Sequence, residues 1–193
     1  MALSFKERKP DEVKNVIAVS FKEFWNANKD KRLIWIGENH DKYEQTRQFV
    51  ERLVGNLGNE KRVVLLAERK GPELLEGSNA YAWLDKLSRS KDVLLEVIDD
   101  TDTYRKERNA HMKKCINDAI EKYGKEENIV FIVITGKRHL VKIPGGGLSE
   151  KEIDDAYISK GITINPQAAV GVFLGECMFS KVRCPFDVWL INE

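Results

Sequence analysis

The sequence predicts an α/β fold with a mixed, mostly parallel central sheet, flanked by helices, and antiparallel strands at its C-terminal edge. Over residues 33–134, short apolar runs alternate with amphipathic segments of helical period. These runs are apolar throughout, as strands are when helices cover both faces of a parallel sheet. After residue 160 the apolar runs follow one another too closely for crossover helices, which favours antiparallel pairing.

Each element is predicted from its own residues. Residues 1–30 are expected to form an N-terminal helical extension, because apolar residues recur there at helical spacing. They are Val13, Ile17, Phe21 and Phe24. The expected strands lie at 33–36, 63–67, 93–98 and 129–134, and the expected helices at 44–57, 79–87, 101–123 and 149–160. The last strands, expected to be antiparallel, lie at 162–164, 169–174 and 186–191.

Local signals set the ends of two of these helices. Thr101, Asp102 and Thr103 offer N-caps for the helix that runs to residue 123, and Gly124 ends it. Ser149 and Glu152 have the spacing of a capping box, which predicts the start of the helix at 149–160.

Composition excludes several classes of protein. Lys and Arg total 32 and Asp and Glu total 31, so the net charge of +1 gives no basic excess for binding nucleic acid. No apolar run approaches the roughly 20 residues that a membrane-spanning helix needs. The three cysteines are odd in number and form no CxxC pair, which excludes a disulfide framework or a structural zinc site as the organising feature.

A single domain over residues 1–193 is expected, because no linker or repeat interrupts the periodic segments. The first residues lack the apolar region of a secretory signal, so a cytoplasmic location is expected, unless the chain is a domain of a larger secreted protein. The oligomeric state is left open.

Polar residues follow each of the four apolar runs of the predicted parallel sheet. Ligands bind at the carboxyl ends of the strands in such sheets, so these clusters are expected to share one edge. The clusters are Gly37-Glu38-Asn39-His40-Asp41, Glu68-Arg69-Lys70, Asp99-Asp100 with Tyr104 to Asn109, and Gly136 to His139. Two of the three histidines therefore lie at this edge.

The residue types at this edge suit acid–base or metal chemistry. A histidine serves as a general base or a metal ligand near neutral pH, and a neighbouring carboxylate orients it or completes the metal site. An arginine holds a substrate carboxylate or stabilises an oxyanion. The predicted catalytic residues are Glu38, His40, Glu68, Arg108 and His139. Arg105, Asn109 and Tyr104 are predicted to bind substrate. His40, His139, Glu38 and Glu68 are the ligand set for a divalent ion such as Mn, Co or Zn.

These residues also have ordinary structural interpretations. A histidine after a strand often only satisfies a polar loop. Glu68 beside Arg69 and Lys70 fits a surface salt bridge, which contributes about 0 to 1 kcal/mol. Arg105 and Arg108 lie in the first turns of a helix, where basic residues oppose the helix dipole, and this mild penalty favours a dedicated purpose.

Four motifs stand at strand ends or at a helix start, across about residues 33–143. They are LIWIGENHD with Gly37 and His40, VVLLAERK with Glu68, YRKERNAHM with Arg105, Arg108, Asn109 and Met112, and IVFIVITGKRHLVKIP with Gly136 and His139. In order and spacing they resemble the TIKI/TraB superfamily, which also contains ChaN-type haem-binding lipoproteins and erythromycin esterases.

The resemblance leaves three functions open. The first is a hydrolase that cleaves an amide or ester bond of a small-molecule or peptide substrate, with water activated by His40 directly or through a metal ion. The second is a domain that binds haem or another small ligand, with Tyr43 or Tyr104 as an axial ligand. The third is a non-catalytic domain of a bacterial toxin. We favour the hydrolase, because both glycine–histidine motifs are intact.

Overall fold

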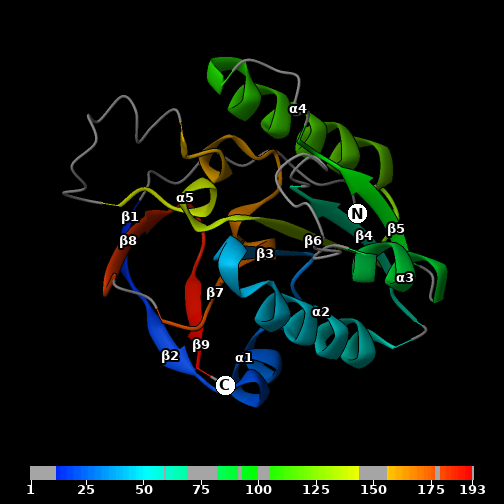
Figure 1. Cartoon of the computed structure of the whole chain (residues 1–193), viewed down its shortest axis with the longest axis horizontal. Coiled ribbons are helices and arrows are strands. Elements are labelled where there is room, and N and C mark those ends of the chain that lie inside the picture. The colour runs from blue at the N-terminus through cyan, green and yellow to red at the C-terminus, as the bar shows by residue number, and fades with distance from the viewer. Residues whose placement is uncertain are drawn as a thin grey trace.

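The α/β class is confirmed by the computed structural model, which describes residues 12–58, 60–68, 82–90, 93–99, 105–143, 156–176 and 179–192. Figure 1 shows a central sheet with α4 on one face and α1, α2 and α3 on the other. No helix within the described ranges is long and apolar enough to cross a membrane.

The central sheet has seven strands, and each neighbouring pair is parallel. Their order is β2 (Ile17–Val19), β9 (Val188–Ile191), β7 (Ala169–Leu174), β3 (Leu33–Glu38), β6 (Ile129–Gly136), β4 (Arg62–Ala67) and β5 (Val93–Val97). A separate two-stranded antiparallel sheet joins β1 (Glu12–Asn15) to β8 (Lys181–Cys184). The structure therefore has an antiparallel strand in its C-terminal part, as the predicted fold class requires, but this strand, β8, is not one of those predicted from the sequence.

The helices cover the sheet in two layers. The α-helices are α1 (Phe21–Asn28), α2 (Tyr43–Leu57), α3 (Ala82–Ser90), α4 (Arg105–Tyr123) and the short α5 (Lys137–Leu140). Three 3₁₀ turns are η1 (His40–Lys42), η3 (Ser159–Gly161) and η4 (Pro166–Ala168). The predicted strands and helices between residues 33 and 134 are confirmed wherever the structure describes them, with ends shifted by a few residues.

Alternation along the strands divides the core between the two faces. Ile34 and Ile36 pack with α1, α2 and α3, whereas Leu33 and Trp35 pack with α4. Each strand of the sheet centre is buried on both faces, which explains why its sequence is apolar without interruption.

The predicted N-terminal helix over residues 1–30 is wrong between residues 12 and 19, where the chain forms β1 and β2. Only α1 is helical, and it begins where the Ser20 hydroxyl accepts from the Glu23 N–H and the Glu23 carboxylate accepts from the Ser20 N–H. Val13 and Ile17 share no buried face with this helix, because they are 54% and 52% exposed on strands that pair with β8 and β9.

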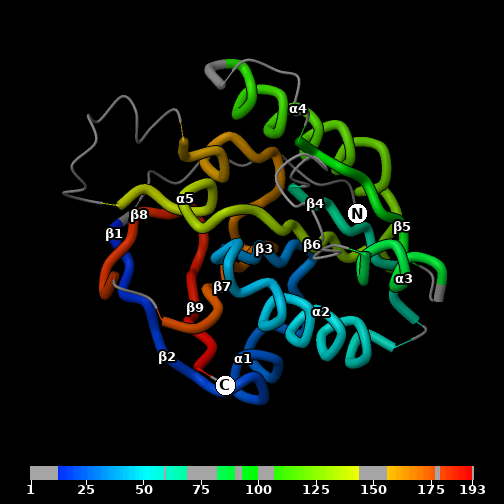
Figure 2. The backbone as a smooth tube through the Cα atoms, viewed as in Figure 1, coloured from blue at the N-terminus to red at the C-terminus, as the bar shows by residue number. Residues whose placement is uncertain are grey.

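The C-terminal strands differ from the prediction in pairing. Residues 162–164 form no strand, and β7 and β9 pair in parallel with each other rather than antiparallel. This pairing needs no crossover helix, because β8 lies between them in sequence and carries the chain back through the small sheet (Figure 2). Of the helix predicted at 149–160, residues 149–155 lie outside the described residues, and 159–161 form the 3₁₀ turn η3.

Thr135→Val tests a buried hydrogen bond between the two central strands β3 and β6. The Trp35 indole N–H donates to the Thr135 hydroxyl over 2.7 Å. Because valine removes the acceptor and leaves a buried donor unpaired, we expect a loss of about 1–3 kcal/mol in the free energy of unfolding, measured with urea. In a Trp35→Phe background the same substitution should cost much less, and an equal cost would show that the bond is not the cause.

Candidate active site

The site lies where the chain leaves two adjacent strands over opposite faces of the sheet. β3 leads through η1 to α2, which packs on the α1–α3 face, whereas β6 leads through α5 to residues that pack on the α4 face. Glu38 and Gly136, the last residues of these strands, are register partners. Such a switch point opens a crevice at the carboxyl ends of parallel strands, and ligands bind there.

Glu38 and His40 form a dyad at the end of β3. The turn η1 brings the imidazole back over the strand end, with Nδ1 at 2.9 Å from Glu38 Oε1. The Glu38 side chain is fully buried and that of His40 is 25% exposed. In the tautomer whose Nδ1–H donates to this carboxylate, Nε2 keeps the lone pair that a general base needs. Nε2 faces Gly136, where a Cβ atom would lie 3.1 Å from it.

Arg108 bridges two buried carboxylates. Its Nε and Nη2 donate to the two oxygens of Asp99 at 2.7 and 2.6 Å, and Nη2 also donates to Glu68 Oε1 at 2.7 Å. The hydrogen bond with Asp99 is the main cause that raises the pKa of Arg108, so the guanidinium stays charged. Asp99 follows β5, held there by the Ile98 N–H that donates to Ala67 O. The Nη1 group of Arg108 has no hydrogen bond to any side chain or backbone group that the structure describes.

Glu68 connects the ends of two strands, β4 and β6, with α4. It follows β4, its backbone N–H donates to Ile134 O of β6, and its Oε2 accepts from the Gly136 N–H at 2.7 Å. Its side chain is 2% exposed, so the surface salt bridge considered from the sequence is not its environment. The carboxylate therefore orders the end of β6 beside the His40 ring.

His139 lies on the short helix α5 and turns its ring toward Glu68. Its Nδ1 is 3.0 Å from the Ala156 carbonyl oxygen, and its Nε2 is 3.8 Å from Glu68 Oε1. Burial lowers the pKa of His139 and outweighs the charge of Glu68, which raises it. The ring is therefore neutral at neutral pH, with Nδ1–H donating to the carbonyl and the lone pair on Nε2.

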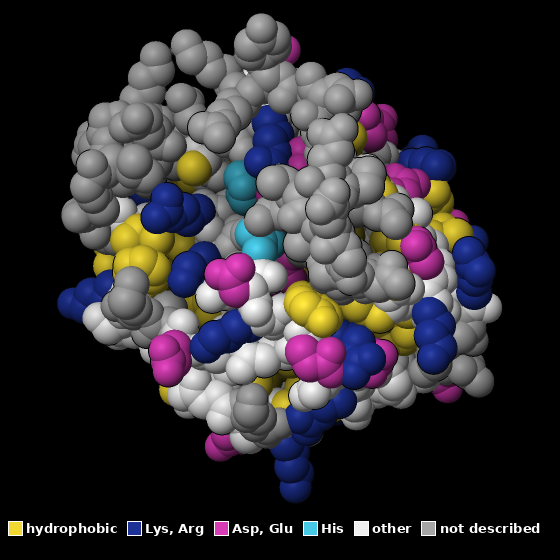
Figure 3. Space-filling view, in the orientation of Figure 1, with side chains coloured by type: hydrophobic (Ala, Val, Ile, Leu, Met, Phe, Trp, Pro, Cys, Tyr) yellow, Lys and Arg dark blue, Asp and Glu magenta, His cyan; other side chains and the backbone are white. Residues whose placement is uncertain are grey.

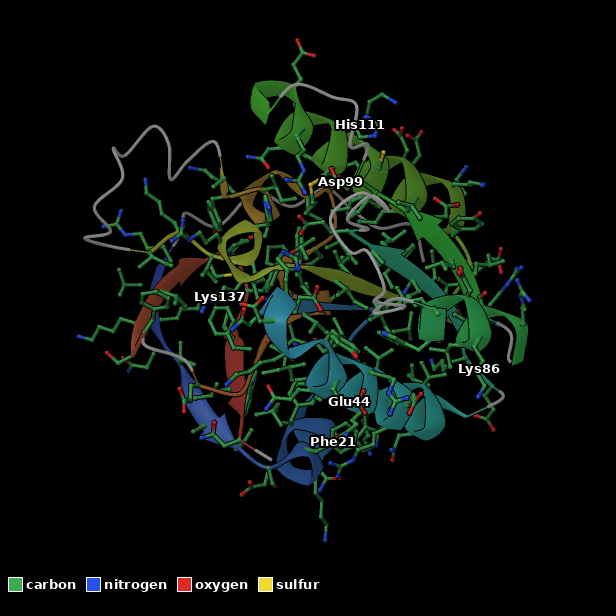
Figure 4. The ribbon with its side chains drawn as sticks, in the orientation of Figure 1. Phe21, Glu44, Lys86, Asp99, His111 and Lys137 are labelled. Carbon is green, nitrogen blue, oxygen red and sulfur yellow. The ribbon has the colours of Figure 1, made fainter. Side chains whose placement is uncertain are left out.

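The five predicted catalytic residues thus come together at one edge. In Figure 3 two cyan histidine side chains lie next to each other, with basic side chains above them and to their left. Figure 4 labels Asp99 and Lys137, which lie on opposite sides of this region. The sequence places Asp99 at this edge, directly after the third apolar run, but indicates no role for it, and the structure shows it as the main partner of Arg108.

The predicted substrate-binding residues are less well defined. Asn109 follows Arg108 on α4 and is half-buried. Arg105 begins α4, but its side chain lies outside the described residues, as does Tyr104. Of the two tyrosines considered as haem ligands, Tyr43 is 37% exposed at the start of α2. Met112, from the same motif as Arg108, is a core residue.

The predicted metal ligands are engaged by protein donors. Glu38 accepts from His40, and Glu68 accepts from Arg108 and Gly136. Over the described ranges, no three His, Cys, Asp or Glu side chains are arranged to hold a metal ion. In this arrangement the guanidinium already supplies the positive charge between the carboxylates. The donor set therefore fits a metal-free site better than a four-ligand metal centre.

Comparisons with protein-family models, with curated proteins and with solved structures gave no match to this chain. The functional interpretation therefore rests on the geometry of the site and on the motifs.

Arg108→Met should be strongly destabilising, because it leaves Asp99 and Glu68 as buried charges without their shared cation. We expect a loss of about 3–5 kcal/mol in the free energy of unfolding by urea denaturation. Lys114→Met is the matched control on the same helix, since it breaks the exposed pair with Asp118 and should cost less than about 1 kcal/mol. Similar losses in the two variants would contradict the bridging role of Arg108.

His139 should make stability depend on pH. Its folded pKa lies below the ordinary value of 6.5, so the unfolded chain binds the proton more tightly. The contribution of this ring to stability is therefore complete above pH 6.5, the ordinary pKa of histidine. It is lost as the pH falls from there toward the pKa of the folded state. We expect the free energy of unfolding, measured with urea, to fall less between pH 7.5 and pH 5.5 in His139→Gln than in wild type. His111→Gln, the control on α4, should keep the wild-type pH dependence; equal profiles for all three proteins would contradict this.

Proposed function

We propose that the protein is a hydrolase of the TIKI/TraB type, which activates water with His40 to cleave an amide or ester bond. The observation that carries this proposal is the dyad of His40 with the fully buried Glu38. A buried carboxylate on Nδ1 fixes the ring orientation and stabilises the imidazolium that forms when Nε2 takes a proton.

The remaining residues fit the steps of such a reaction. His40 Nε2 removes a proton from water, and the water oxygen attacks the substrate carbonyl carbon. The tetrahedral oxyanion accepts hydrogen bonds from Arg108 Nη1, whose guanidinium is held in place through Nε and Nη2. The imidazolium then returns its proton to the leaving oxygen or nitrogen as the bond to the carbonyl carbon breaks.

His40→Ala should reduce hydrolysis by about 10²–10⁴-fold in kcat, because general base catalysis contributes that much. Circular dichroism should show an unchanged fold, since the ring is partly exposed. Glu38→Gln should also lower kcat, because an amide stabilises the imidazolium less well. His111→Ala, which changes the third histidine of the chain, should keep wild-type activity, and full activity of His40→Ala would refute the proposal.

Elemental analysis of wild type and His40→Ala distinguishes the metal-free route from the metal-assisted one. We expect no near-stoichiometric Mn, Co or Zn in either protein, and hydrolysis that survives chelators. A metal content present in wild type and absent in His40→Ala would assign His40 as a ligand instead. If the absorption spectrum of haem shifts on addition of one equivalent of protein, and no hydrolysis is found, the ligand-binding function is favoured instead.

A further inference from the structure

Two hydrogen-bond acceptors face each other at the edge between α5 and β4. His139 Nδ1 is committed to the Ala156 carbonyl, so the neutral ring presents a lone pair at Nε2. Glu68 Oε1 lies 3.8 Å from it, beyond hydrogen-bond distance, and has a second lone pair beside its bond with Arg108. Two acceptors that face each other form no hydrogen bond with one another. His139 Nε2 and Glu68 Oε1 could therefore both accept from a donor group of a ligand.

The charge at this edge also favours a cation. Asp99 and Glu68 are 1% and 2% exposed, and both share the single guanidinium of Arg108. Lys137 and Arg138 follow Gly136, but neither forms an ion pair with these carboxylates in the described part of the chain. Among the described residues, one guanidinium thus faces two buried carboxylates, and because a partly compensated buried charge is costly, one further positive group would be bound favourably here.

We propose that the edge between His139 and Glu68 binds the primary ammonium group of an amine-bearing substrate. An ammonium has both the donors and the charge that the described residues leave unsupplied between His139 Nε2 and Glu68 Oε1. The 3.8 Å separation of the two acceptors allows one nitrogen, beside the line that joins them, to lie about 2.8 Å from both. The assignment of this group to a substrate that is turned over rests on the proposed hydrolase function.

The closeness of His139 and Glu68 to His40 indicates which class of substrate the site would take. A Cβ atom at Gly136 would lie 3.1 Å from His40 Nε2, 3.7 Å from Glu68 Oε2 and 3.7 Å from His139 Cδ2, so the three side chains surround one small space. An ammonium group at His139 and Glu68 therefore lies next to the base. The scissile carbonyl is then close to the amino group in the substrate, as in the esters and amides of amino acids.

Binding is tested first, without any requirement for turnover. Isothermal titration calorimetry with ethylammonium should show binding to wild type that is at least about tenfold tighter than that of tetramethylammonium, which carries the same charge but no N–H donor. Glu68→Gln and His139→Gln should each weaken ethylammonium binding about tenfold or more, whereas Lys114→Gln should leave it unchanged. Both variants are first checked for folding by urea denaturation, and if one fails, the other carries the comparison.

Equal affinity for the two cations, or no measurable binding of ethylammonium, would overturn the proposal. Binding that survives both substitutions would also overturn it, because it would place the ammonium elsewhere.

A matched pair of esters then tests the substrate class. Glycine ethyl ester and ethyl propionate differ in the replacement of an amino group by a methyl group. We expect kcat/KM to favour the amine-bearing ester by about tenfold or more in wild type, and the preference to disappear in His139→Gln. Equal rates for the two esters would overturn the inference and leave the hydrolase intact. Ammonium binding at this edge without hydrolysis of either ester would leave the inference intact and count against the hydrolase.

Discussion

A single guanidinium between two buried carboxylates organises this site. Arg108 comes from α4, whereas Asp99 and Glu68 follow β5 and β4, so their contact fastens a helix to two strand ends. Glu68 extends the connection to β6 through the Gly136 N–H. Since a lone buried charge is far costlier than a paired one, the three side chains hold one arrangement. The groups that surround the reactive space are positioned by this network.

The site draws on both layers of the protein. The dyad stands where the chain leaves β3 toward α2, and His139 stands where it leaves β6 toward the opposite face. His40 and Glu38 therefore meet at the turn that leads to α2, whereas Arg108 belongs to α4 on the other face of the sheet. Glycine at position 136 suits this convergence, because a Cβ there would lie 3.1 Å from His40 Nε2 and the ring would have to shift. A sheet centre covered on both faces thus supports the candidate site at its edge.

The sequence predicts the centre of the fold better than its margins, for physical reasons. Strands such as β3 and β6 are buried on both faces, so their apolar runs carry the signal by themselves. The strands β1 and β2 are short and exposed, and their partners lie at the other end of the chain. No local pattern contains that pairing, so the spacing of Val13, Ile17 and Phe21 predicts a helix where the chain forms strands. The return of the chain through β8 is not predictable from local pattern either, because β8 pairs with β1 at the other end of the chain.

The candidate residues could be predicted because parallel strands deliver their carboxyl ends to one edge. The contacts between these residues could not be predicted, because the contacts depend on the order of the strands in the sheet. Glu68 reaches Gly136 because β4 lies beside β6, and Arg108 reaches Asp99 because α4 begins above β5. The carbonyl that orients His139 belongs to Ala156, a residue with no chemical signature in the sequence.

The pairing of β2 with β9 has a consequence for folding kinetics. Ile17 is the register partner of Trp189, so this parallel pair closes a loop that contains nearly the whole domain. Contacts of such long sequence separation form late, because the entropy of loop closure must be overcome before they stabilise anything. During synthesis β2 leaves the ribosome long before β9 exists. The strands that lead into the candidate site, β3, β4 and β6, can assemble while that edge of the sheet is still open.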